Sequence, residues 1–250
     1  MKKLLVTTLM SVMAICASAQ NVQFHYDFGK HIFNNDEHNR QDVTLTYEDF
    51  SADATGSWYW FIDADINKNG LKGAYTEITR EFNVGKNGFA AHVEYDGGLD
   101  KTSTFQQAVL VGPAWNGHNA DFSTTYSIQV MYKQFFGQKF NNGCQGAAFD
   151  GAKSAYPSFQ VTGVWSTRFA GDKLTFSGFA DLWRGVQLKN GHGCLVFLTE
   201  PQLWYNISKK VSVGTEIEIS NNFVYSDPER TTGYNDKFFV NPTLAFKFNM

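Results

Sequence analysis

A period of two runs through most of this chain, and no stretch shows helical periodicity of useful length. Residues 211–220, VSVGTEIEIS, show the pattern clearly, because Val211, Val213 and Ile217 alternate with small or acidic residues. Successive side chains of a β-strand point to opposite faces, so such a segment forms a strand with one apolar and one polar face. The chain is therefore predicted to be all-β.

The same pattern predicts about twelve strands, most of them near 10 residues long. The connections alternate in length, with short turns such as 170–173 and 208–210 and longer polar segments such as 30–41 and 136–157. This arrangement is typical of outer-membrane barrels, whereas strands of globular proteins usually have only about 5–6 residues. The predicted strands are 21–29, 42–50, 58–66, 74–82, 89–96, 105–115, 122–135, 158–169, 174–183, 195–207, 211–224 and 238–250.

The first 19 residues have the composition of a secretory signal peptide. Lys2 and Lys3 precede the apolar run 4–15, and Ala17-Ser18-Ala19 matches an A-x-A cleavage site. The rest of the chain keeps all 24 acidic residues and loses two of the 21 basic ones, which argues against a nucleic-acid partner. It contains no apolar run of roughly 18 residues that could form a membrane helix. We expect export through the periplasm and a single domain over 20–250.

Aromatic residues make up 16% of the chain and charged residues only 18%, which is an unusual balance for a soluble exported protein. Together with the strand lengths, this balance favours an antiparallel transmembrane outer-membrane β-barrel of about 12 strands over a soluble all-β domain. The outward face of such a barrel would contact outer-membrane lipid.

In a membrane barrel the apolar face of each strand contacts lipid and the polar face lines the lumen. The alternation places nearly every carboxylate on the lumen face, with Asp49 near a strand end as an exception. Arg80 falls on the lipid face, and we expect either that it extends to the barrel rim or that a β-bulge shifts its register. The predicted lumen carboxylates are Asp27, Asp42, Glu48, Asp63, Asp65, Glu77, Glu81, Glu94, Asp96, Asp181, Glu200, Glu216 and Glu218.

The lumen face has few fixed cations, namely Lys133, Arg168 and Lys247, and it shares its acidic residues with aromatic rings. Such a lumen favours neutral or cationic solutes with flat rings and disfavours anions, because like charges repel in a confined space. The alternative for each residue is a polar network that only fills the interior. The candidate solute-binding residues are Tyr59, Phe61, Asp63, Tyr75, Glu77, Glu81, His92, Glu94, Lys133, Arg168, Phe179, Asp181, Glu200, Trp204, Glu216 and Glu218.

Six segments carry a resemblance to a known family: VQFHYDFG, AHVEYDGGL, SGFADLWR, TEPQLWYNI, GTEIEISNNF and NPTLAFKF. The chain resembles an uncharacterised Bacteroidota outer-membrane family, a domain of unknown function related to the Tsx-type nucleoside-specific channels. The resemblance implies a twelve-stranded monomeric barrel and the uptake of nucleosides or similar small solutes. It assigns no solute-contacting residue.

Cys144 and Cys194 remain after the signal peptide, and both are predicted to lie on the extracellular side. In an oxidising environment they are predicted to form a disulfide, with two reduced thiols as the alternative. The last strand ends in Phe248-Asn249-Met250 after an alternating aromatic pattern. Outer-membrane proteins often end in such a strand, so we expect the assembly machinery to recognise it.

Residues 65–70, DINKNG, match the first half of a calcium-binding loop. An EF-hand also requires flanking helices and a glutamate at the twelfth loop position, where this chain has Thr76. A hairpin turn on Asn69-Gly70 is the preferred interpretation, because these residue types tolerate positive φ. We expect no metal and no cofactor.

Two other classes of function remain open. One is a barrel with a lipid- or peptide-processing enzymatic site, since His92, Glu94 and Asp96 share one strand face. No nucleophile motif accompanies these residues, so we expect no enzymatic activity. The other is a structural or interaction barrel without transport.

Overall fold

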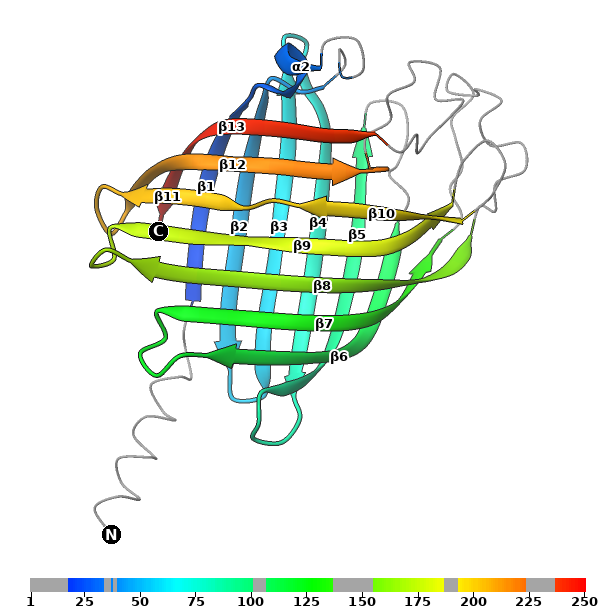
Figure 1. Cartoon of the computed structure of the whole chain (residues 1–250), viewed down its shortest axis with the longest axis vertical. Coiled ribbons are helices and arrows are strands. Elements are labelled where there is room, and N and C mark those ends of the chain that lie inside the picture. The colour runs from blue at the N-terminus through cyan, green and yellow to red at the C-terminus, as the bar shows by residue number, and fades with distance from the viewer. Residues whose placement is uncertain are drawn as a thin grey trace.

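The computed structural model describes residues 18–33, 37, 40–100, 107–136, 155–186, 193–223 and 237–250. Most of these residues lie in β-strands, and the helix α2 within them is a single turn, Gly29–Ile32 (Figure 1). No helix in the described ranges has the length and apolar character needed to cross a membrane. The strands are β1 (Ser18–Asp27), β2 (Val43–Asp53), β3 (Gly56–Asn67), β4 (Gly70–Asn83), β5 (Phe89–Asp100), β6 (Ala108–His118), β7 (Thr124–Phe135), β8 (Tyr156–Phe169), β9 (Leu174–Val186), β10 (Gly193–Thr199), β11 (Gln202–Asn206), β12 (Val211–Asn221) and β13 (Phe238–Asn249).

The strands form one closed antiparallel sheet. Neighbouring strands in the chain pair from β1 to β9, and β13 pairs with both β12 and β1, which closes the barrel. β10 and β11 lie end to end between β9 and β12 and together complete one span. The barrel therefore has twelve spans, which confirms the fold predicted from the sequence.

The sequence predicted one strand over 195–207, and the structure interrupts it at Glu200-Pro201. Proline has no N–H group to donate to a neighbouring strand, so the ladder breaks there. The span keeps its contact with β9, because Glu200 N donates to Phe179 O at 3.1 Å. Gly178 of β9 accommodates the break: its φ is +148°, and a Cβ atom there would lie 2.5 Å from the Glu200 carbonyl oxygen.

The predicted signal peptide lies mostly outside the described residues, which begin at Ser18. β1 starts at this residue and not at the predicted residue 21. Ser18 and Ala19 pair with Ser51 and Phe50 of β2. Cleavage after Ala19 remains a prediction, and it would remove these two residues from β1.

The two ends of the barrel differ in their connections. We call the end where β1 begins and β13 ends the terminal end, and the opposite end the long-loop end. In chain order, connections at the terminal end alternate with those at the long-loop end. The terminal end carries 54–55, 84–88, 119–123, 170–173 and 207–210, and the long-loop end carries 28–42, 68–69, 101–107, 136–155, 187–192 and 222–237.

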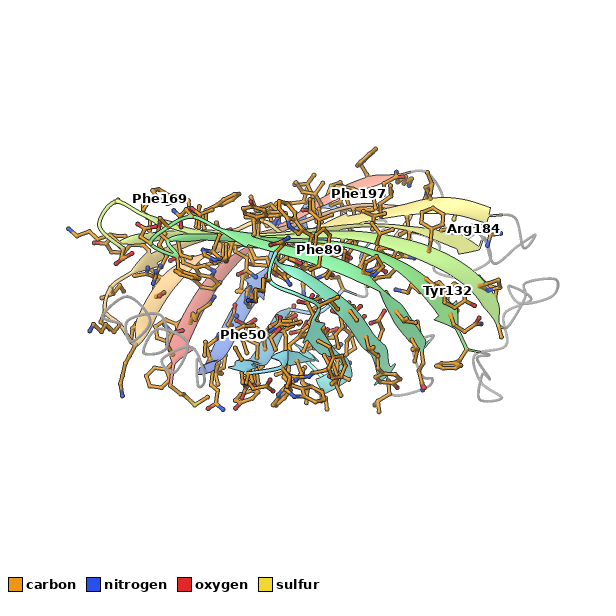
Figure 2. The ribbon with its side chains drawn as sticks, turned by 90° about the horizontal axis from the view of Figure 1, so that it is seen from below. Phe50, Phe89, Tyr132, Phe169, Arg184 and Phe197 are labelled. Carbon is orange, nitrogen blue, oxygen red and sulfur yellow. The ribbon has the colours of Figure 1, made fainter. Side chains whose placement is uncertain are left out.

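The barrel wall separates an apolar outer face from a polar inner face. Figure 2 shows the side chains on the ribbon from below. In β7, Val130 and Tyr132 are exposed on the outer face, whereas Met131 and Lys133 are buried inside the barrel. Residues directly opposite each other on antiparallel strands point to the same face, so the register carries this division from strand to strand. The division agrees with the alternation in the sequence.

Arg80 lies on the outer face, where it pairs with Trp58 and Val93. Its guanidinium reaches Asp53, the last residue of β2, with Nη1 2.9 Å from Asp53 Oδ2. The guanidinium also lies 5.1 Å from the centroid of the Trp58 ring. The register shift between β3 and β4 falls at the other end of these strands. The contact with a terminal-end turn therefore supports the rim explanation and not the bulge.

Candidate functional site

The candidate solute-binding residues occupy inward positions on their strands, except Glu200 in the break between β10 and β11, and they differ in how deeply they lie. Arg168 is at the terminal rim, where its side chain is 49% exposed and its Nε lies 3.7 Å from Asp172 Oδ1. Lys133 is buried inside the barrel, and Lys247 is half-buried there. Of the three cations predicted for the inward face of the strands, only Lys133 and Lys247 therefore lie inside the barrel.

Part of the inner face borders free space. Phe50 and Val164 are each 39% exposed, although they pair directly with the inward-facing Tyr59 and Phe179. Apolar side chains exposed on an inner face indicate free space beside them. Both lie in the half of their strand that is nearer the terminal end. We call the part of the interior next to these two residue pairs the terminal vestibule.

A strip of aromatic rings and carboxylates follows β3 and β4 along the interior. The ring centroids of Tyr59 and Phe61 are 6.0 Å apart, as are those of Phe61 and Tyr75. Tyr59 donates a hydrogen bond to Glu48 Oε2 at 3.2 Å, and Tyr75 donates to Glu77 Oε1 at 2.9 Å. All five residues, which we call the aromatic–acid strip, are half-buried and so remain accessible from the interior.

A second acidic wall is built from β11, β12 and the break before β11. Glu200 and Glu216 are half-buried, and their charges interact with that of Asp63 on β3. Gln202 donates to Glu216 Oε2 at 2.6 Å and accepts from Trp204 Nε1 at 2.9 Å. Trp204 itself is 1% exposed. It therefore supports this wall and does not line the open space, which differs from its predicted position on the solute path.

His92 of β5 lies between two carboxylates, that of Glu81 on β4 and that of Glu94 on β5. Its Nδ1 is 3.1 Å from Glu81 Oε1, and its Nε2 is 3.1 Å from Glu94 Oε2. Asn116 donates to the other oxygen of Glu81 at 2.6 Å, and Thr79 donates to Glu94 Oε2 at 3.1 Å. With 1% exposure and both ring nitrogens engaged, His92 forms part of the wall.

The interior along β5 to β8 is packed like the core of a soluble protein. Lys133 Nζ lies 2.8 Å from Asp96 Oδ2 and donates to Gln160 Oε1 at 2.7 Å. This wall matches the space-filling alternative that the sequence left open. The buried apolar residues beside Lys133 are Ala108, Leu110, Met131, Phe135 and Tyr156, with Trp183 packed against them.

A charged cluster from the β1–β2 connection enters the long-loop end. Arg40 Nε lies 2.8 Å from Asp27 Oδ2, and Nη2 lies 2.8 Å from Glu218 Oε2. Its Nη1 is 3.2 Å from Glu37 Oε1, and Asn241 donates to both Glu37 and Glu218 at 3.0 Å. Burial raises the pKa of Glu37 to about 7, against the opposing effect of Arg40. Arg40 and Glu37 could not be identified from the sequence, because strand alternation says nothing about side chains in a loop.

Three carboxylates meet where β4 and β5 pair. Glu77, Glu94 and Asp96 each bring one oxygen to within 4.8 Å of the others. Glu77 and Asp96 are register partners, and Glu94 precedes Asp96 by two residues on the same face. Oxygen atoms in this arrangement can bind a hard metal ion.

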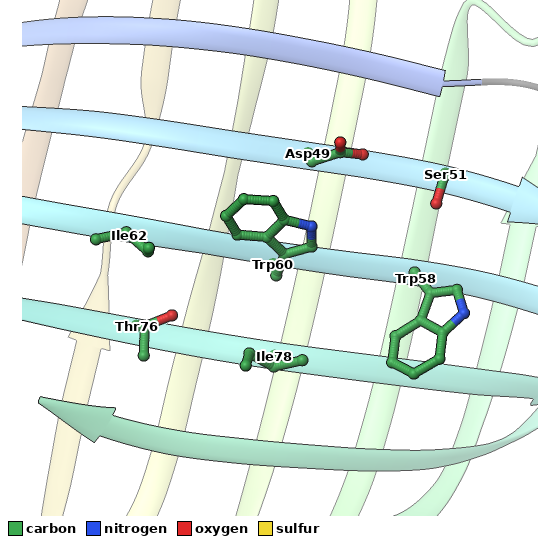
Figure 3. Close-up of a pocket in the computed structure, with 7 residues that line it drawn as sticks. All are labelled: Asp49, Ser51, Trp58, Trp60, Ile62, Thr76 and Ile78. Carbon is green, nitrogen blue, oxygen red and sulfur yellow. The ribbon is translucent and has the colours of Figure 1, made fainter.

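The outer wall carries a groove of about 540 Å³ between β2, β3 and β4 (Figure 3). Trp58, Trp60 and Ile78 line it, with Asp49 at its edge (Figure 3). Gln20 donates to Asp49 Oδ2 at 2.6 Å, so this outward carboxylate has a polar partner. Aromatic residues of this kind are enriched where barrels contact a membrane interface, and the groove is separate from the interior.

Residues 65–70 form a hairpin, in agreement with the turn predicted on Asn69-Gly70. β3 ends at Asn67 and β4 begins at Gly70, whose φ is +84°. Asn69 N donates to Asn67 Oδ1 at 2.8 Å, and Thr44 donates to Asp65 Oδ1 at 2.9 Å. The resemblance of DINKNG to a calcium loop is therefore explained by a turn.

Of the two cysteines, Cys144 lies outside the described residues, and Cys194 lies at the start of β10 on the long-loop side. The disulfide remains a prediction. β13 presents Leu244, Phe246 and Phe248 on the outer face, in agreement with the alternating terminal strand.

The closed antiparallel twelve-strand barrel, with an apolar outer face and an acidic interior, defines the class: it is a β-barrel similar to the outer-membrane porins. The chain belongs to the family described as Domain of unknown function (DUF5020), which matches residues 19–250. No curated protein matches the chain.

A solved porin structure supports the fold of this chain, and a second solved structure resembles it more weakly. The structure described as "NanC porin structure in rhombohedral crystal form" covers 93% of this chain and 100% of its own, with a TM-score of 0.59 and 12% identity. The match to the Acinetobacter baumannii outer membrane protein Omp33 covers 94% of this chain and 98% of that protein's chain, with a TM-score of 0.41 and 11% identity. That second score is too low to support an argument, and the identity to the porin is low enough that the likeness concerns the fold alone.

Proposed function

We propose that this chain is a channel of the bacterial outer membrane for small neutral or cationic solutes. The apolar outer face, the closed wall and the porin-like fold support a place in the outer membrane. In this arrangement the terminal end faces the periplasm and the long-loop end faces the outside, because barrels of this kind have short periplasmic turns. Outer-membrane lipid then contacts the outer face.

The aromatic–acid strip beside the terminal vestibule is the observation that carries the proposal. Half-buried Tyr59, Phe61 and Tyr75 offer ring faces, and Glu48 and Glu77 offer carboxylates next to them. A flat uncharged ring can stack on the aromatic residues, while its amino and hydroxyl groups donate to the carboxylates. Anions meet repulsion from the same groups.

Nucleosides are the solutes that we propose within this class. A nucleoside combines a flat base with a sugar rich in hydroxyl groups, which matches the ring and carboxylate pattern of the strip. The resemblance of six sequence segments to a family related to Tsx-type channels supports the same choice. We propose no enzymatic role, because His92 is enclosed by Glu81 and Glu94.

A structural barrel without transport is the second candidate, and the packed wall along β5 to β8 favours it. The Arg40 cluster at the long-loop end favours it as well, since its bonds hold a connection inside the barrel mouth. Conductance distinguishes the two candidates directly.

The test is single-channel recording of the purified barrel in planar bilayers under a salt gradient. We expect cation-selective conductance that adenosine blocks and that adenosine monophosphate, an anion, blocks more weakly. Asp63→Asn should reduce the cation selectivity, whereas the outward-facing control Asp49→Asn should leave it unchanged. A barrel that neither conducts nor lets nucleosides swell proteoliposomes would refute the proposal in favour of a structural role.

A further inference from the structure

We propose that Glu77, Glu94 and Asp96 form a binding site for one hard divalent cation, with calcium as the best fit. The site lies in the inner wall where β4 and β5 pair, apart from the DINKNG hairpin that resembles a calcium loop in sequence. It differs from the expectation drawn from the sequence that the chain binds no metal. It does not depend on whether the barrel conducts.

The spacing of the three carboxylates fits a single ion. One oxygen from each residue lies within 4.8 Å of the other two. Calcium binds oxygen ligands at about 2.3–2.6 Å, so two ligands on opposite sides of one ion are at most about 5 Å apart. All three oxygens can therefore contact the same ion with little movement of the side chains.

Each of the three carboxylates accepts a hydrogen bond from a neighbouring side chain. Donors of this kind orient metal ligands, and such contacts are a regular part of metal sites. Two of the three donors come from β4 and the third comes from β7. They are Tyr75 OH to Glu77 Oε1 at 2.9 Å, Thr79 Oγ1 to Glu94 Oε2 at 3.1 Å, and Lys133 Nζ to Asp96 Oδ2 at 2.8 Å.

Asp96 gives an independent reason to expect a ligand. Its side chain is 6% exposed, and its Oδ1 atom has no hydrogen-bond partner among the described residues. Lys133 bonds only the other oxygen, Oδ2. A buried carboxylate oxygen without a partner costs free energy, because it has lost its contact with water. A cation placed between Asp96 and the two glutamates supplies the missing interaction.

The charge around the cluster also favours a divalent ion. Glu81 lies beside the three ligands through its contact with His92, which brings the number of carboxylates to four. His92 and Lys133 can contribute at most two positive charges. When all four carboxylates are ionised, as metal ligands are, at least two negative charges remain, and one divalent ion neutralises these.

The donor set selects the type of ion. All three ligands are carboxylate oxygens, and the nearby His92 already contacts Glu81 and the ligand Glu94 through its two nitrogens, at 3.1 Å each. Softer metals such as zinc prefer nitrogen or sulfur ligands. Calcium accepts several carboxylates in a flexible geometry, whereas magnesium usually binds one or two and keeps most of its water.

Terbium luminescence tests the site on the refolded full-length barrel in detergent. Terbium replaces calcium at oxygen sites, and Tyr75 lies close enough to the cluster to sensitise it. We expect a saturable signal that calcium displaces more effectively than magnesium. Glu77→Gln and Asp96→Asn should each weaken binding about tenfold or more. Both variants remove a carboxylate from a crowded acidic cluster, and the mobility of unheated protein on a gel reports that the barrel is folded.

Two control variants localise the signal. Asp65→Asn removes the first acid of the DINKNG hairpin, and Glu216→Gln removes an interior carboxylate bonded to Gln202. Neither should change terbium binding. The proposal fails if the wild type shows no saturable signal, if the cluster variants bind normally, or if either control loses binding. If a proton shared between Glu94 and Asp96 takes the place of the cation, the wild type shows no saturable terbium signal. Since binding and conductance are measured separately, this failure would leave the channel proposal intact.

Discussion

Replacement of Arg40 with methionine tests whether the charged cluster at the long-loop end stabilises the barrel. The substitution keeps much of the apolar volume of the side chain and removes its charge. It leaves Glu37, Asp27 and Glu218 without the cation that contacts all three. Removal of one partner from a buried ion pair costs about 3–5 kcal/mol, so we expect a loss of unfolding free energy in this range at pH 8.

The loss should be smaller at pH 5.5. The pKa of Glu37, about 7 in the folded protein, lies above its ordinary value of 4.5. The folded state therefore binds the Glu37 proton more tightly than the unfolded state does. This contribution is complete below pH 4.5 and declines by about 1.4 kcal/mol per pH unit until the pH passes 7. A protonated Glu37 leaves one fewer unpaired charge when Arg40 is absent, and the absence of Arg40 raises the pKa of Glu37 further.

Urea unfolding of the refolded barrel, followed by tryptophan fluorescence, measures both effects. Arg168→Met is the matched control, because that arginine is 49% exposed and its pairing with Asp172 is worth at most about 1 kcal/mol. The reasoning is refuted if Arg40→Met and the control have equal stability at pH 8, or if the loss for Arg40→Met is the same at both pH values.

Three further predictions concern other parts of the chain. Gly178→Ala should lower the unfolding free energy by about 1–3 kcal/mol, because φ at this position is +148° and a backbone carbonyl would lie 2.5 Å from the new Cβ. The control Gly163→Ala has open space around the new Cβ and should have a much smaller effect in the same urea titration. Deletion of 248–250 should reduce the amount of barrel in isolated outer membranes, and unchanged levels would argue against recognition of the last strand. Cys144 and Cys194 should be protected from alkylation until a reductant is added, and alkylation without reductant would disprove the disulfide.

The barrel wall could be predicted from the sequence because the alternation of side chains is a local property of extended backbone. Val211, Val213 and Ile217 show their outward face without any knowledge of the neighbouring strands. Pro201 marks the break in its span, since proline cannot complete a strand ladder, whereas the alternation alone predicts one continuous strand over 195–207.

The depth of each inward residue could not be predicted in the same way. Strand parity places Trp204 and Phe179 on the same face, but packing from other strands buries the first and leaves the second half-exposed. Glu37 and Arg40 were missed because they lie in a connection with no periodic pattern. Their positions follow from contacts with Glu218 of β12, which is distant in the sequence.

The unequal filling of the interior divides the inward positions into two groups with different tolerance to mutation. Substitutions at Leu110, Met131 or Lys133 act on a packed core and should be limited by stability. The side chains of Phe50 and Val164 face open space, so substitutions there can change the size and chemistry of the vestibule with little loss of unfolding free energy. Related chains could therefore acquire a different solute preference along one side of the barrel while the other side keeps the fold unchanged.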